Sequence, residues 1–289
     1  MTTELAVISV DPVSDYRQLT EFPFMVHALE AGALVAVTAA VIGWFMVLRR
    51  QTFAGHTLSL VAFPGASAAA LAGLPVAAGY YAACATGAAL LAGVSGTGPR
   101  SHAAESAAIG TLQATALGLG FLFVSLSHDV LGGLSALLFG TFLGITAGQV
   151  LTLLLVALVA LAAISFAARP LLFSSIDREL AGAGGVPVRA LGFGFLLLLG
   201  LAVAATAQIT GALLVFALLV TPPATAFVLT ARPLASLALA VAIALAVTWL
   251  GLAIAYFSPY PVGFWVTSLS FLAYVLARAG TAVSRRRRG

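Results

Sequence analysis

The sequence contains no lysine and only one cysteine, and charged residues make up 8% of its 289 positions. Soluble proteins carry about 25% charged residues, so a chain this poor in charge cannot cover a water-exposed surface. A Walker A loop needs a lysine to reach the nucleotide phosphates, so the chain is not a conventional P-loop ATPase. The single cysteine, Cys84, cannot form a disulfide within the chain.

What remains is apolar sequence in long runs, with 62% hydrophobic residues overall. Runs of this length predict membrane-spanning helices, and the fold class is therefore an all-α polytopic membrane protein. Arginines between the runs favour the cytoplasmic side, which places the N-terminus outside and the C-terminus in the cytoplasm. We expect about nine spans, or eight if one weak segment does not cross. The predicted spans are 24–48, 57–77, 79–94, 104–125, 150–168, 191–210, 213–229, 234–257 and 262–279.

The chain divides into one transmembrane domain at 24–280 and two short ends. Residues 1–23 are acidic and lack a basic start followed by an apolar core, so they predict an extracytoplasmic tail and not a signal peptide. Residues 281–289 form a basic tail that suits a cytoplasmic end beside anionic lipid, and no nucleic-acid partner is expected. The glycine-rich segment 130–148 is predicted to be re-entrant, because a full crossing would place Arg169 outside.

The stretch from Arg49 to Gly65 joins the first two apolar runs and contains His56. An ionisable group at membrane depth suggests function, and neutral imidazole suits zinc, copper, nickel and iron. His56 is therefore the main candidate for a pathway residue, provided that Gly55 lets the chain bend into the membrane. The alternative is a histidine near the headgroups that bonds a backbone carbonyl. The predicted helix breaks within the spans are Gly55, Pro64, Gly65, Pro222 and Pro223.

Four other polar residues are candidates beside Ser59, which follows His56 on the same run. Glu105 is a possible carboxylate partner for a cation, although it also fits an ordinary helix start. Gln113 lies within a predicted span, where a pathway role and an interhelical hydrogen bond both account for it. His128 and Asp129 would lie at the outer mouth and attract a cation, or form a solvated turn.

Gly79, Ala83 and Gly87 recur every four residues within the predicted span 79–94. Small residues at this spacing form a helix face that another helix can approach closely.

The longest polar interruption contains a predicted short helix at about 174–184. Serines precede an acidic first turn, which is typical of a helix start, and glycines close the segment. A membrane domain without its own motor must receive force from another polypeptide, and a helix here suits docking on an ATPase. The alternative is an ordinary cytoplasmic loop. The residues expected to make this contact are Asp177, Arg178, Glu179 and Gly185.

The same segment carries a resemblance. Asp177 to Ala181 (DRELA), followed by Gly185 to Arg189 (GVPVR), resembles the coupling-helix region of the zinc/manganese-type ABC transporter permeases. Further similar segments are Leu137 to Gly140, Thr210 to Thr225, and the frame of Gly55, Ser59 and Pro64-Gly65. The resemblance covers roughly 24–277. Two positions depart from it, because His56 stands where the family has aspartate and Leu60 where it has histidine.

The resemblance implies a non-enzymatic permease of a bacterial plasma membrane that imports zinc or manganese by alternating access. It also implies a homodimer with the pathway at its axis, two cytoplasmic ATPase subunits that bind ATP, and an extracellular solute-binding protein. No permanently bound cofactor is expected. Three alternatives remain: a permease of the same fold for a metal chelate or a non-metal, a secondary transporter, and an intramembrane serine protease at Ser67.

Overall fold

The computed structural model describes residues 22–96, 102–127, 137–140, 144–212 and 215–286, and the regular structure in these residues is α-helical. The helices are α2 (Pro23–Leu48), α3 (Thr52–Leu71), α4 (Val76–Gly96), α5 (His102–Leu126), α7 (Ala147–Ile176), α8 (Arg178–Ala183), α9 (Val188–Thr210), α10 (Val215–Leu229), α11 (Pro233–Tyr256) and α12 (Val262–Arg286).

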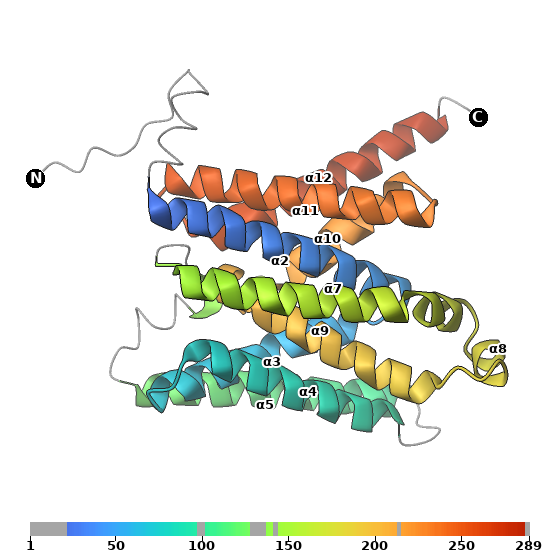
Figure 1. Ribbon diagram of the computed structural model, residues 1–289, viewed down its shortest axis with the longest axis horizontal. Helices are drawn as coiled ribbons and strands as arrows, with labels where there is room; N and C mark the ends of the chain where they lie inside the picture. Colours follow the sequence, from blue (N-terminus) through green and yellow to red (C-terminus); the bar gives the residue numbers. More distant parts are fainter. Residues whose placement is uncertain (1–21, 97–101, 128–136, 141–143, 213–214, 287–289) are drawn as a thin grey trace, which may run out of the picture.

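The long helices run along one common direction, and α8 lies at one end of the bundle, called here the α8 end (Figure 1). The start of α2 lies at the opposite end, and α12 finishes toward the α8 end. Seven of the described helices are long and apolar enough to cross a membrane, whereas α3 and α10 are not among them. The predicted all-helical polytopic fold is confirmed.

The helices form two groups that share α9. One group is α3, α4 and α5, in which α3 packs against both neighbours. The other group is α2, α7, α10, α11 and α12, as Figure 1 also shows. Because α9 contacts α2, α3, α4 and α7, it joins the two groups through the middle of the molecule.

Local sequence explains where several helices begin. Pro23 and Pro233 occupy the first positions of α2 and α11, where a missing N–H is no loss. Thr146 and Gln149 form a capping box that starts α7. This helix then continues past the predicted end at residue 168 and through Pro170 to Ile176, so it includes part of the segment expected to form the coupling helix.

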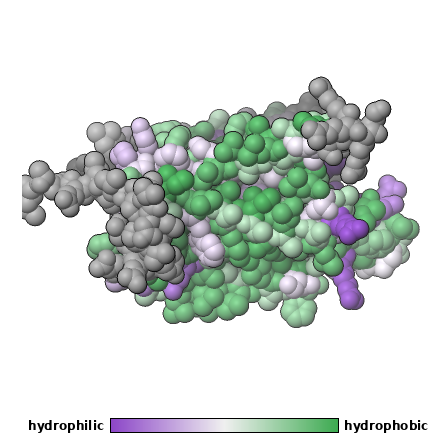
Figure 2. All heavy atoms as spheres, turned by 90° about the horizontal axis from the view of Figure 1, so that it is seen from above, coloured by the Kyte–Doolittle hydropathy of each residue, from purple (hydrophilic) through white to green (hydrophobic). Residues whose placement is uncertain are grey.

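On the face that Figure 2 shows, the surface between the two ends is mostly hydrophobic, and the most hydrophilic side chains gather at the α8 end. Phe166 of α7, for example, is 90% exposed. A surface of this kind is stable against lipid and not against water.

Candidate functional site

His56 lies about one turn into α3, and its side chain is half-buried. Its ring packs edge-on against Phe216 of α10, with the ring centroids 5.0 Å apart. The Nδ1 atom is buried and makes no hydrogen bond within the described part of the chain. Leaving a buried polar atom without a partner costs about 1–3 kcal/mol, so this nitrogen keeps an unmet capacity for a hydrogen bond or a ligand.

The residues near His56 differ in the hydrogen bonds that they make and in the surface that they present. Gln113 of α5 donates from its side-chain amide to the Thr57 hydroxyl at 2.9 Å, which is the interhelical bond that the sequence left open as an alternative. The Ser59 hydroxyl donates to the His56 carbonyl at 2.7 Å and so serves its own helix. Leu60 is buried one turn after His56 and supplies only apolar surface.

The predicted break at Pro64 is wrong, because α3 is continuous from Thr52 to Leu71. Proline removes one backbone donor, and such a loss is tolerated in membrane helices where side chains and neighbouring helices satisfy the backbone. The carbonyl that loses its helical donor at Pro64 is that of Leu60. The Ser67 hydroxyl donates to the Phe63 carbonyl at 3.0 Å and lies 3.2 Å from the Pro64 carbonyl, so it does not replace that bond.

Gly55 and Gly65 are also inside α3, so these predicted breaks are wrong as well. Both positions are packing contacts instead. A Cβ on Gly55 would overlap the Met46 sulfur of α2, and a Cβ on Gly65 would overlap the Gly79 carbonyl of α4.

Gly87 of α4 also lies against α3, because a Cβ on it would be only 3.0 Å from a Val61 methyl. The predicted small-residue face of α4 is therefore confirmed, and α3 is its partner.

Pro222 and Pro223 do not break α10, which continues from Val215 to Leu229. Because Pro223 has no N–H, it cannot bond the carbonyl of Leu219 four residues earlier. This carbonyl lies against Gly43 of α2, where any Cβ would overlap its oxygen. The lost helical bond is thus accommodated by close contact between two backbones.

The interruption falls at Gly211 instead, between α9 and α10, where φ is 75°. Gly140 also has φ of 75°, and a Cβ on either glycine would overlap the backbone of the other segment. The Leu137 carbonyl accepts two hydrogen bonds here, from the Ala212 N–H at 3.0 Å and from the Tyr80 hydroxyl at 3.2 Å. The segment at 137–140 and the turn at Gly211 therefore pack closely against each other inside the bundle.

At the α8 end, Asp177 is the N-cap of α8, and its carboxylate accepts from the Leu180 N–H at 2.9 Å. The separate helix is thus shorter than the predicted 174–184, because the serines belong to α7. Arg178 and Glu179 are exposed in the first turn of α8. Gly185 lies just after the end of this helix and has φ of 85°.

Arg49 connects this end to the rest of the bundle. Its guanidinium donates to the Ser174 hydroxyl at 3.0 Å and to the Gln51 side chain at 3.4 Å, and it lies over the Phe195 ring at 5.3 Å. Burial lowers its pKa, and the positive charge of Arg178 lowers it further. A cleft of about 930 Å³ opens beside it and reaches Ala54, two residues before His56.

Three candidates lie where the structure gives no account of them. His128 and Asp129 fall outside the described residues, and so does most of the predicted re-entrant segment. Glu105 belongs to α5, but its side chain is not described. Within the described part of the chain, no three histidine, cysteine, aspartate or glutamate side chains group closely enough to hold a metal ion.

Sequence reasoning missed two features of the site. It used Arg49 only as a marker of membrane sidedness, and it did not pair His56 with Phe216. The signal that could have pointed to Arg49 was the arginine pair directly before a span that carries a histidine. Nothing in the sequence pattern indicated the second, because the contact depends on how α10 crosses α3.

The fold and this site define a class of protein. A helical bundle of this kind, with seven described helices long and apolar enough to cross a bilayer and a hydrophobic outer surface, is a polytopic membrane protein. The chain belongs to the ABC 3 transport family, whose sequence model matches residues 21–280. It is accordingly a permease of the metal and metal-chelate type.

Known proteins similar to the chain agree with this family. It is 32% identical over 217 residues to the manganese transport system membrane protein MntC of Halalkalibacterium halodurans, covering 75% of this chain and 73% of that protein. It is also 32% identical over 213 residues to the chelated iron transport system membrane protein YfeC of Yersinia pestis, covering 73% and 70%. Its fold matches PsaBC from Streptococcus pneumoniae in complex with Fab, with a TM-score of 0.81, 25% identity, and coverage of 92% and 94%.

Proposed function

We propose that the chain imports a divalent transition metal along a pathway beside His56, by alternating access. The observation that carries this proposal is the buried Nδ1 of His56, which has no partner within the described residues. Imidazole suits zinc and iron, whereas carboxylate and water suit manganese. The donor present here therefore favours zinc or iron(II) over manganese, although manganese appears in the names of several relatives.

We further propose that two copies of the chain form the pathway between them. A single chain offers one imidazole at this position and no group of three ligands within its described part. Two copies related by a twofold axis would supply two His56 side chains. A sparse set of ligands suits transport, because a site in a pathway must release what it binds.

The α8 end is proposed to face the cytoplasm of a bacterial cell, because arginines gather there and favour the cytoplasmic side. Energy would come from a separate ATPase, since the chain lacks lysine and with it a Walker A loop. Ile176 and Leu180 support docking of that ATPase on α8, because they are 84% and 58% exposed beside the charged first turn. A solute-binding protein would deliver the cargo at the opposite end.

A metal chelate is a second candidate cargo. Leu60 and Phe216 place apolar surface near His56, which suits an organic chelator better than a hydrated ion. The similarity to a relative named for chelated iron supports this option.

The test is ATP-dependent uptake into vesicles that contain the chain with its cognate ATPase and binding protein. Zinc, iron(II) and manganese are compared for the wild type, His56→Ala and Leu60→His. His27→Ala is the matched control, because His27 lies on α2 near the opposite end. We expect His56→Ala to abolish uptake of the preferred ion, the control to retain it, and Leu60→His to increase zinc uptake by adding a second imidazole.

Metal uptake that survives His56→Ala would remove His56 from the pathway. ATPase activity coupled to the permease without movement of any free ion would instead assign the cargo to the chelate class.

A further inference from the structure

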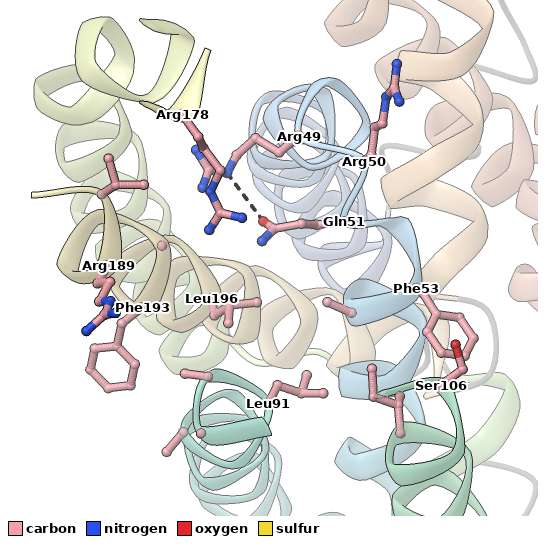
Figure 3. Close-up of a pocket in the computed structure, with 17 residues that line it drawn as sticks. Arg49, Arg50, Gln51, Phe53, Leu91, Ser106, Arg178, Arg189, Phe193 and Leu196 are labelled. Carbon is pink, nitrogen blue, oxygen red and sulfur yellow. Dashed lines mark hydrogen bonds between the residues drawn. The ribbon is translucent and has the colours of Figure 1, made fainter. Parts of the chain in front are cut away.

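The cleft at the α8 end is lined by four arginines that come from three parts of the chain. Arg49 and Arg50 lie in the turn between α2 and α3, Arg178 lies in α8 and Arg189 in α9. Figure 3 shows the Arg49 and Arg178 side chains converging beside Gln51, with Arg189 next to Phe193, while Arg50 points away from them. Two guanidinium groups thus converge in the cleft, and a third, that of Arg189, lines another part of it.

No acidic residue balances these charges among the described residues that line the cleft. Arg49 is already bonded to neutral partners, Ser174 and Gln51, and Arg178 is exposed. Like charges this close repel each other unless an anion lies between them. Guanidinium groups bind phosphate oxygens through paired N–H donors, which makes phosphate a suitable anion.

The rest of the lining is apolar. Phe53, Leu91, Ile109, Phe193 and Leu196 form the wall below the arginines. Phe53 and Phe193 are 47% and 43% exposed, so this wall is open to whatever fills the cleft. A cationic rim above an apolar wall, at the end of a membrane bundle, matches a headgroup joined to an acyl chain and not a small hydrated anion. Basic pockets between membrane helices bind anionic lipid headgroups in this way.

We propose that this cleft binds an anionic phospholipid, with its phosphate held by Arg49 and Arg178, Arg189 adding to the cationic rim, and the start of its acyl chain against Phe53 and Phe193. The proposal does not depend on which cargo the protein carries. An occupied cleft would hold α8 and α9 against the α2–α3 turn, because its arginines come from all three.

The experiment is native mass spectrometry of the full chain released from micelles containing phosphatidylglycerol or phosphatidylcholine. The test variant is Arg178→Gln/Arg189→Gln, and both residues are exposed, so the fold is retained. Arg232→Gln is the matched control, because Arg232 precedes α11 and does not line the cleft. Each arginine near an anionic headgroup contributes about fivefold in affinity, so we expect the double variant to retain phosphatidylglycerol about 30-fold more weakly.

Retention of phosphatidylglycerol by the wild type and by Arg232→Gln, with little phosphatidylcholine, supports the proposal. Equal retention by the double variant, or equal retention of both lipids, overturns it. Displacement by millimolar inorganic phosphate would assign the cleft to free phosphate, and loss of the lipid on addition of the ATPase would assign it to that protein surface; either result overturns the lipid site.

Discussion

The contact between Gly65 of α3 and Gly79 of α4 gives a direct test of how the bundle positions His56. A methyl group on Gly65 would overlap both the Gly79 carbonyl oxygen and the Ala83 Cβ, and neither can move without moving α4. The two helices must therefore separate. Overpacking of this kind costs about 1–3 kcal/mol.

Gly110→Ala is the matched control for Gly65→Ala. Gly110 lies in α5, and a Cβ built on it meets nothing within 4 Å. Alanine there should gain up to about 1 kcal/mol from helix propensity. Gly65 is also inside a helix, so the same gain applies there, and the two variants should differ by the overpacking cost of about 1–3 kcal/mol in the free energy of unfolding.

The measurement is the free energy of unfolding in mixed micelles titrated with denaturing detergent, followed by circular dichroism. Gly65→Ala should unfold earlier than the wild type, and Gly110→Ala at the same point or later. Metal uptake should fall in Gly65→Ala as well, because α3 carries His56. If Gly65→Ala were as stable as Gly110→Ala, the close approach of α3 and α4 would not be a constraint and the reasoning would fail.

Asp177→Ala should remove the N-cap of α8, at a cost of about 1 kcal/mol, and reduce the permease-stimulated activity of the ATPase. Asp177→Asn keeps a capping oxygen and should retain that activity; equal activity of the two variants would contradict a role for the cap. Gly211→Ala should be less stable than the wild type in the same unfolding titration, because it combines a positive φ with overlap of the Leu138 carbonyl. If Gly211→Ala were as stable as the wild type, the close contact at Gly211 would be contradicted. Gln208 of α9 donates to the Tyr81 hydroxyl of α4 at 2.9 Å. A double-mutant cycle with Gln208→Leu and Tyr81→Phe should give a coupling of about 0.6 kcal/mol, the average for such bonds in membranes, and zero coupling would rule out the bond.

The helices could be predicted from the sequence where apolar length decides the outcome. The first predicted span ends at Leu48, where α2 ends, and the seventh ends at Leu229, where α10 ends. Arg49 directly follows the end of α2, and a polar turn directly follows the end of α10. The end of α7 was missed by several residues, because Arg169 and Pro170 lie inside a helix that continues beyond them.

The predicted breaks failed for a different reason. Pro64 and Pro223 were taken to end helices because proline removes a backbone donor, but α3 and α10 continue through them, and at Pro223 a neighbouring helix accommodates the loss. Leu219 shows how, since its carbonyl rests against Gly43, nearly 180 positions away in the sequence. Contacts between residues so far apart have no local pattern. The interruption at Gly211, by contrast, falls between the predicted spans 191–210 and 213–229.

The candidate site was predictable in part. His56 was identified because an ionisable side chain in an apolar run is unusual, and Gln113 because an amide in a span needs a partner. The cleft was not identified, because its arginines come from segments that the fold brings together. Arg178 and Arg189 were assigned to a coupling region, and nothing in the sequence showed that Arg49 would lie beside them.

The two donors to the Leu137 carbonyl have a consequence for how the chain is made. Ala212 follows Leu137 by 75 residues, so at about 5–20 residues per second a ribosome needs roughly 4–15 s to produce it. Tyr80 precedes Leu137 and is already present when that carbonyl enters the bilayer. The tyrosine can therefore satisfy the carbonyl during synthesis until α9 is inserted and the Ala212 backbone arrives. Tyr80→Phe should accordingly lower the yield of inserted protein more than it lowers the stability of protein that has finished folding.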